Sequence, residues 1–267
     1  MYLSYWKLKE NPFENTPDPR FLYHSPQHEE ALSRLVYVVR ETKGFGLLTG
    51  TYGCGKTLLA HALFNELEKD VYRVAYITNP RLDDIELLRM ILHSLGFDNL
   101  PNRKADLLIK LEEILIANIN DGRKTVLVID EAHAIELPTI FEELRLLLNY
   151  QYENQFMLSI LLLGQPELKG KVDSSKQLSQ RISMRYHLSS LSREETELYI
   201  FHRLVIAGSK SGLFDEEALG LIFDRSGGIP RRINQICDLS LLNGMHCKSE
   251  LIDSLIIKET IDSILGG

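Results

Sequence analysis

Hydrophobic and polar positions follow two alternating patterns along the first two thirds of this chain. Short apolar runs typical of β-strands lie at residues 45–49, 72–77, 125–129 and 157–163, with a shorter one near 184–188. Stretches with apolar residues at helical spacing lie between these runs. Because strands that alternate with helices form a parallel sheet with right-handed crossovers, the pattern predicts an α/β domain that ends near residue 190.

Beyond residue 190 the pattern is helical throughout. Ser192–Glu195 reads as a capping box, Asp215 caps a helix that Gly227-Gly228 closes, and Pro230 starts another helix. A last amphipathic helix carries Leu251, Leu255, Ile256, Ile261 and Leu265. We therefore expect residues 191–267 to form a small all-helical lid domain that hinges near residue 190.

The first 27 residues are rich in proline and aromatic side chains. Pro12, Pro17 and Pro19 exclude a continuous helix, so the segment is expected to be an extended arm that lies over the α/β domain, within residues 1–190. Its aromatic side chains have two interpretations. They bury against the core, or part of the arm, Phe21 or Tyr23, borders an adenine ring.

A glycine-rich segment follows the first predicted strand. It reads Gly50-Thr51-Tyr52-Gly53-Cys54-Gly55-Lys56-Thr57 and is followed at Leu58 by a stretch of helix-forming residues, as the phosphate-binding loop pattern G-x-x-x-x-G-K-[ST] requires. Backbone N–H groups at a helix N-terminus would surround phosphate oxygens. Lys56 would then reach the β- and γ-phosphates of ATP, and the Thr57 hydroxyl would ligate Mg²⁺.

An acid pair, Asp130 and Glu131, comes directly after the strongly apolar run 125–129. Two carboxylates at the end of a buried strand need a partner, and here we expect Asp130 to hold Mg²⁺ while Glu131 orients and deprotonates a water. The alternative is a solvated pair that caps the following helix. Asn79, which ends the second strand, is either a turn residue before Pro80 or a hydrogen-bond partner that restrains Glu131.

Composition and charge restrict the class of protein. The 267 residues are 44% hydrophobic and 25% charged, with a net charge of −7 and a pI near 5.7, which argues against nucleic-acid or anionic-lipid binding by bulk charge. Three cysteines without pattern indicate a reducing cytoplasm rather than a disulfide framework or a metal site. No apolar run is long enough for a signal peptide or a membrane span.

Several segments together resemble the AAA+ superfamily, a group of P-loop NTPases, and more closely the ExeA-like (general secretion pathway protein A) ATPases. The resemblance covers nearly the whole chain. It rests on Asn11-Pro12-Phe13, residues 17–23, the phosphate loop, Ile129-Asp130-Glu131-Ala132-His133, residues 163–168, Gln180-Arg181-Ile182 and residues 227–234. The tetrapeptide Asp-Glu-Ala-His also occurs in RNA helicases, but the chain has no room for their second RecA-like domain.

The resemblance implies roles for further residues. Gln165 looks like the polar sensor after the fourth strand, or else caps that strand. Arg231, ahead of Arg232, looks like a second sensor of the γ-phosphate in the lid, where a cation at a helix N-terminus favours an anionic ligand. Arg181 or Arg185 looks like an arginine finger offered in trans to a neighbouring subunit, or else is structural.

The resemblance also implies an ATPase of a bacterial type II secretion or pilus assembly system that works in protein transport. We expect a homo-oligomer with a membrane-embedded partner, in the cytoplasm, either peripheral at the inner membrane or as the cytoplasmic domain of a membrane protein whose continuation lies after Gly266-Gly267. Two alternatives stay open. One is an ATP-dependent DNA-binding regulator resembling transposition target-selection ATPases, and the other is a nucleotide-gated scaffold with negligible turnover.

Overall fold

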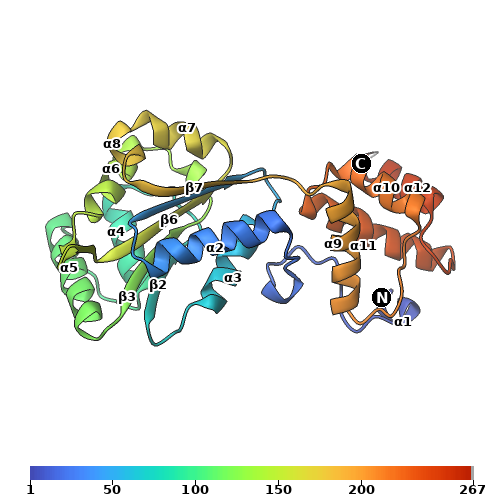
Figure 1. Ribbon diagram of the computed structural model, residues 1–267, viewed down its shortest axis with the longest axis horizontal. Helices are drawn as coiled ribbons and strands as arrows, with labels where there is room; N and C mark the ends of the chain where they lie inside the picture. Colours follow the sequence, from blue (N-terminus) through green and yellow to red (C-terminus); the bar gives the residue numbers. More distant parts are fainter. Residues whose placement is uncertain (266–267) are drawn as a thin grey trace. The chain divides into compact units, whose positions relative to one another are not determined.

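The computed structural model describes residues 1–265, whose contacts divide the chain into two compact units (Figure 1). The sheet unit comprises Pro26–Tyr52 and Leu59–Leu188. The helical unit comprises Met1–Ser25, Gly53–Leu58 and the residues from Ser189 onward. Each unit has a hydrophobic core of its own.

The sheet unit is built on five parallel strands in the order β2-β3-β6-β1-β7. Their bounds are Phe45–Gly50 for β1, Tyr72–Ile77 for β2, Lys124–Ile129 for β3, Leu158–Gly164 for β6 and Ile182–Leu188 for β7. β1, β3 and β6 are apolar and buried on both faces, as expected for central strands of a parallel sheet. Since every pair is parallel, the carboxyl ends of all five strands share one edge of the sheet.

Helices cover both faces of this sheet. On one face Leu47, Leu127 and Ile160 pack in a core with α4 (Asp84–Ser94), α5 (Lys104–Asn120), α6 (Pro138–Leu147), α7 (Glu167–Ser174) and α8 (Lys176–Ser179). The other face carries α2 (Pro26–Arg40) and the main part of α3 (Lys56–Glu66), as Figure 1 shows. There the rings of His61 and Phe64 meet Tyr76 of β2 edge-on. A short hairpin of β4 (Gln151–Tyr152) and β5 (Gln155–Phe156) precedes β6 and was not predicted.

The helical unit contains α9 (Arg193–Ile206), α10 (Glu216–Ser226), α11 (Pro230–His246) and α12 (Ser254–Leu265). The predicted capping box of Ser192 with Glu195 is present, and Asp215 caps α10. The predicted apolar face of the last helix is partly wrong. Leu255 is 65% exposed and Leu251 lies outside α12, because Ile256, Ile257 and Ile261 form its buried face. The side chain of Leu265 and residues 266–267 lie outside the described residues.

The N-terminal arm packs in the core of the helical unit. It contains the short helix α1 (Leu3–Trp6) and the 3₁₀ turn η1 (Pro19–Phe21), and its Trp6 and Phe13 are buried among α9–α12. The ring of Phe21 lies 4.9 Å from the Arg203 guanidinium, and Tyr23 meets Tyr199 edge-on at 6.2 Å. The expected domains 1–190 and 191–267 stay a prediction, but the arm's contacts group it with the helices rather than with the sheet.

The described residues contain no helix with the length and apolarity that a bilayer crossing needs.

Candidate functional site

The ends of three neighbouring strands bring the predicted sheet-unit residues together. β6 lies between β1 and β3, with Thr49 of β1 opposite Gly164 of β6 and Ile129 of β3 opposite Leu162. Gly50, Asp130 and Gln165 therefore lie at the same edge. Only glycine fits at position 50, since a Cβ atom there would lie 2.6 Å from the carbonyl oxygen of Leu188.

Asp130 is 3% exposed, and its carboxylate accepts hydrogen bonds from Tyr76 and from the Glu131 backbone. The Tyr76 hydroxyl donates to its Oδ2 at 3.1 Å, and the backbone N–H of Glu131 donates to its Oδ1 at 2.8 Å. Burial, and then the charge of Asp130, raises the pKa of Tyr76 well above its ordinary value, so the phenol stays a donor. The sequence reasoning missed Tyr76. The parallel pairing of Tyr76 with Val128 places it two positions before Asp130, which is the signal that could have found it.

Glu131 occupies the left-handed region of backbone space, with φ 51° and ψ 30°, which is costly for a residue other than glycine. This conformation turns the chain from β3 into the 3₁₀ turn η2 (Ala132–Ala134). The Glu131 carboxylate is 39% exposed, and its Oε2 lies 3.4 Å from Nδ1 of His133. The Glu131 carboxylate is thus partly exposed, with the His133 ring beside it.

His133 also contacts Gln165. Its Nε2 lies 3.0 Å from the side-chain amide nitrogen of Gln165, and its Nδ1 lies 3.4 Å from the Gln165 backbone nitrogen. Sequence reasoning gave His133 no role beyond the motif. Asn79 is in a turn and accepts from the backbone N–H of Arg81 at 3.5 Å, so within the described residues its side chain makes no bond to Glu131.

The second half of the phosphate loop belongs to the helical unit. Gly53 and Gly55 have φ values of 86° and 100°, which glycine adopts without strain. The backbone N–H of Arg231 donates to the Gly53 carbonyl at 3.2 Å, and a Cβ atom at position 53 would lie 2.8 Å from Cβ of Arg231. The loop is thereby fixed against the first turn of α11. Arg232 instead lines a groove of about 370 Å³ with Arg225.

The predicted loop residues differ in exposure. Cys54 and Lys56 are buried, and Lys56 is the first residue of α3, whereas Thr51 and Tyr52 are exposed and Thr57 is intermediate. Glycines in the left-handed conformation ahead of a helix N-terminus form a concave set of N–H donors that suits phosphate oxygens. The Asp130 carboxylate supplies the hard oxygen that Mg²⁺ prefers. Taken separately, the loop glycines therefore fit a nucleotide phosphate, and Asp130 fits a divalent cation.

The two candidate arginine fingers differ in their hydrogen bonds. Arg185 is tied within the sheet unit, because it donates to Asp173 at 2.8 Å and to the Ser179 hydroxyl at 2.7 Å. The Arg181 guanidinium makes no hydrogen bond to another described residue. Glu142 has a pKa below its ordinary value mainly through Arg145, with a smaller contribution from the charge of Arg181.

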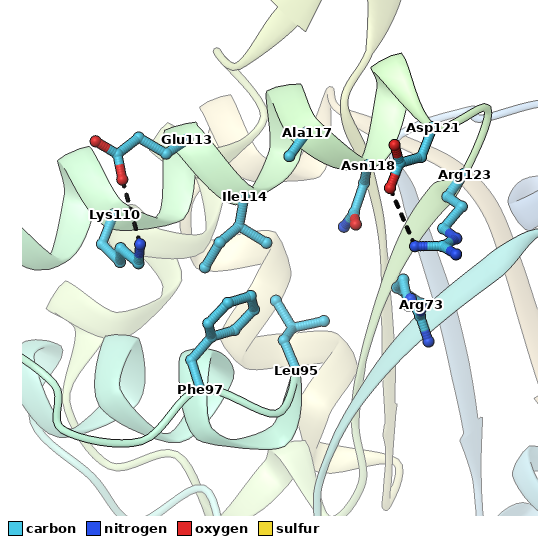
Figure 2. Close-up of a pocket in the computed structure, with 10 residues that line it drawn as sticks. All are labelled: Arg73, Leu95, Phe97, Lys110, Glu113, Ile114, Ala117, Asn118, Asp121 and Arg123. Carbon is cyan, nitrogen blue, oxygen red and sulfur yellow. Dashed lines mark hydrogen bonds and ion pairs between the residues drawn. The ribbon is translucent and has the colours of Figure 1, made fainter.

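A separate pocket of about 520 Å³ lies at the opposite edge of the sheet (Figure 2). It is lined by Arg73 near the start of β2 and by Arg123 just before β3, with Phe97 and Ile114 as its apolar wall. Figure 2 shows that Asp121 pairs with Arg123 and that Glu113 pairs with Lys110. The amino ends of the strands are far from Asp130 and Gln165, so this pocket is not part of the site described above.

A match to the AAA domain family covers residues 39–172, about half of the chain. The chain belongs to the AAA domain family. General secretion pathway protein A of Aeromonas hydrophila is 39% identical over 245 residues, or 91% of this chain and 44% of that protein. This identity confirms the resemblance predicted from the sequence, and the chain spans less than half the length of that relative.

Solved structures share the fold. The ORC2 protein of Aeropyrum pernix, solved in ADPNP and ADP complexes, aligns with a TM-score of 0.72 at 16% identity over 95% of this chain and 71% of that chain. Drosophila ORC bound to DNA aligns with a TM-score of 0.74 at 15% identity, over 99% of this chain and 66% of that chain. The predicted fold, a parallel AAA+ sheet flanked by helices with a helical C-terminal region, is confirmed.

Proposed function

We propose that this chain binds and hydrolyses ATP as the AAA+ module of a bacterial secretion or pilus assembly system. The observation that carries the proposal is the convergence of the acid pair and Gln165 on the sheet edge where β1 ends and the phosphate loop begins. An acid pair, a polar side chain and a phosphate loop at one edge are the parts that γ-phosphate hydrolysis needs.

In this proposal the phosphate loop, from Gly50 to Leu58, holds the phosphates of ATP. Lys56 contacts the β- and γ-phosphates, while Thr57 and Asp130 ligate Mg²⁺. When bound, Mg²⁺ supplies positive charge that neutralises the phosphate oxygens. Tyr76 keeps Asp130 oriented, because its hydroxyl donates to the buried carboxylate oxygen Oδ2.

Glu131 is the general base, since its partly exposed carboxylate can accept a proton from water. Gln165 contacts the γ-phosphate or the attacking water. Arg231 senses the γ-phosphate from the first turn of α11, whose backbone already contacts Gly53. The nucleotide state would then reach the lid through that contact.

Assembly completes the site. We propose that Arg181 acts in trans as the arginine finger of a neighbouring copy, because within residues 1–265 its guanidinium makes no hydrogen bond whereas that of Arg185 does. The identity with general secretion pathway protein A supports a membrane-embedded secretion or pilus partner and a place at the cytoplasmic face of the inner membrane. It also favours secretion over the DNA-binding alternative.

The test compares three variants of the purified chain. Glu131→Gln should lower kcat at least about a hundredfold while ATP affinity stays within about threefold, because a general base acts on the reaction and not on binding. Lys56→Ala should abolish ATP binding. Glu136→Gln is the matched control, since Glu136 is an exposed glutamate that pairs with exposed Arg81, and it should leave the rate unchanged.

Unchanged hydrolysis in Glu131→Gln would refute the assignment of the base. ATP binding without any Glu131-dependent turnover would support a scaffold instead. Retention on DNA that requires ATP and weakens with salt would support the DNA-binding regulator.

A further inference from the structure

We propose that the pocket at the amino edge of the sheet binds a segment of a partner protein in which an apolar side chain lies next to an acidic one. The pocket has a volume of about 520 Å³ and lies between β2, the loop after α4, and α5 (Figure 2). This volume is within the range of ligand-binding pockets. The proposal does not depend on the proposed function, because no residue assigned to the nucleotide site lines this pocket.

A largely buried carboxamide at this pocket has only one of its two ends bonded. Asn118 of α5 is 9% exposed, and its Nδ2 donates to the Thr125 hydroxyl at 2.9 Å. The other end makes no hydrogen bond to any of residues 1–265 and faces the pocket, as Figure 2 shows. Because a polar atom in such a position is costly without a partner, it is a position at which a ligand group can bind.

A peptide group suits Asn118 in either orientation of its carboxamide. The carboxamide has a donor end and an acceptor end, and whichever end bonds Thr125, the other end faces the pocket. A main-chain peptide group has both an N–H donor and a C=O acceptor, so it can pair with either end. A phosphate or a carboxylate only accepts, so it can pair with the donor end alone. Asn118 therefore favours the main chain of a bound peptide.

Arg73 offers a positive charge next to this carboxamide. It is the second residue of β2, an edge strand, and pairs in register with Thr125 of β3. Paired residues of parallel strands face the same side of the sheet, so Arg73 leaves the sheet on the side of Asn118. Arg73 is exposed and makes no hydrogen bond or ion pair with another of residues 1–265. A guanidinium of this kind binds a carboxylate through two parallel hydrogen bonds.

The other charged residues of the pocket are already paired. Lys110 lies 3.4 Å from Glu113, and Arg123 donates to Asp121 at 3.1 Å. Within the described lining, Arg73 is therefore the cation that lacks an acid. One carboxylate matches one free guanidinium, whereas a nucleic acid is bound through several phosphate contacts. The occupant thus has a single acidic side chain at this position.

Apolar side chains form the other side of the pocket. Leu95 and Phe97 follow α4, and Ile114 of α5 is 6% exposed. Figure 2 shows Asn118 between this apolar wall and Arg73. In an apolar residue followed by an acidic one, the peptide group likewise lies between the two side chains. The apolar side chain would cover the wall and remove it from water, while the carboxylate reaches Arg73.

The first experiment titrates the blocked peptide acetyl-Gly-Leu-Asp-Gly-amide into the full chain and follows binding by NMR. We expect a dissociation constant of about 1 mM or lower, with nuclear Overhauser effects from the leucine methyls to ring protons that are assigned by their loss in Phe97→Leu. Acetyl-Gly-Leu-Asn-Gly-amide keeps the shape without the charge and should bind about tenfold more weakly. No binding at about 10 mM, or equal affinity of the two peptides, would overturn the proposal.

The second experiment places the charge on Arg73. Arg73→Gln should weaken binding of the aspartate peptide about tenfold and leave that of the asparagine peptide unchanged, because only the former pairs a charge with position 73. The matched control is Arg103→Gln, an exposed arginine just before α5 and outside the pocket, which should change neither affinity. Unchanged backbone NMR signals of β3 show that each variant is folded. Equal effects of the two substitutions would refute recognition by Arg73.

Two competitors then test the class of ligand. Inorganic phosphate and acetyl-Gly-Leu with a free carboxyl end are each added to the complex with the aspartate peptide. We expect neither to displace the peptide at equal concentration, since phosphate has no apolar side chain and the free carboxyl end has no peptide group beyond its leucine. Displacement by phosphate would identify a simple anion site, and displacement by the free carboxyl end would identify a site for a chain terminus. Either result would overturn the proposal.

Discussion

Arg203 connects the N-terminal arm to the helical unit, and its replacement should loosen the arm. The side chain is 5% exposed. It donates to the carbonyl oxygens of Pro12 and, at 3.0 Å, of Glu14, and to the Tyr199 hydroxyl at 2.8 Å. Its guanidinium also lies over the ring of Phe21. Arg203 therefore donates to two buried or partly buried carbonyls of a segment that has little regular structure of its own, and Asn234 also donates to the Glu14 carbonyl at 3.5 Å.

The substitution Arg203→Met keeps most of the side-chain volume and removes all three donors. The Pro12 carbonyl is then left without this donor, at a cost of about 1–3 kcal/mol, whereas the Glu14 carbonyl keeps the longer bond from Asn234. Removing a buried charge returns part of that cost, since the charge no longer has to be desolvated. We expect the free energy of unfolding of the helical unit to fall by about 2–4 kcal/mol.

Trp6 is the assay. It is the one tryptophan of the chain, it is buried in the helical unit, and its Nε1 donates to the Leu241 carbonyl at 2.8 Å. Its fluorescence during urea titration reports the unfolding of this unit. The matched control is Arg193→Met on the same helix, since Arg193 makes an exposed ion pair with Asp224 that should contribute less than about 1 kcal/mol.

If the urea midpoint measured by Trp6 fluorescence is the same in Arg203→Met as in the wild type, the reasoning is refuted. An equal shift in Arg193→Met would also refute it, because any loss of an arginine would then suffice. Hydrogen exchange in β3 gives a second check, since Leu127 belongs to the core of the sheet unit and its protection should not follow the loss of the arm.

Three further predictions concern other residues. Burial lowers the pKa of His202 in the folded protein, so the unfolded chain binds more protons. The free energy of unfolding should therefore fall as the pH drops from about 7 to below the lowered pKa. His202→Phe should flatten this pH dependence of the urea midpoint that Trp6 fluorescence reports. Gly164→Ala should lower the free energy of unfolding by about 1–3 kcal/mol and broaden or shift the His133 ring signals, because its Cβ crowds the η2 backbone. If the finger acts in trans, turnover per subunit should rise with protein concentration in the wild type but not in Arg181→Ala, while Arg73→Ala at the opposite sheet edge behaves as wild type.

Local chemistry explains what could be predicted from the sequence. Strand β3 was predicted from its apolar run, and the caps at Ser192 and Asp215 from residues within one turn of each helix. The phosphate loop and the acid pair are likewise contiguous in sequence. Each of these features depends on neighbours a few residues away, which a single sequence contains.

Features that depend on distant segments were missed. The bond from Tyr76 to Asp130 requires the pairing of β2 with β3, and the contact of His133 with Gln165 requires the pairing of β3 with β6. The arm was grouped with the sheet because proline and aromatic residues show that a segment is irregular but not which core its rings enter. Leu255 was counted among the apolar positions of the last helix and is exposed, because helical periodicity alone does not fix the rotation of a helix on its neighbours.

The site therefore depends on strand register as much as on the site residues themselves. Ile77 pairs with Ile129, and Ile129 with Leu162, so Asp130, His133 and Gln165 meet only in this alignment. A shift of one residue between two strands displaces their ends by about 3.3 Å and reverses the faces of their side chains. That displacement exceeds the tolerance of a hydrogen bond such as the 3.0 Å contact of His133 with Gln165. The apolar residues of β3 and β6, which are buried on both faces, thus fix the register that brings His133 into contact with Gln165.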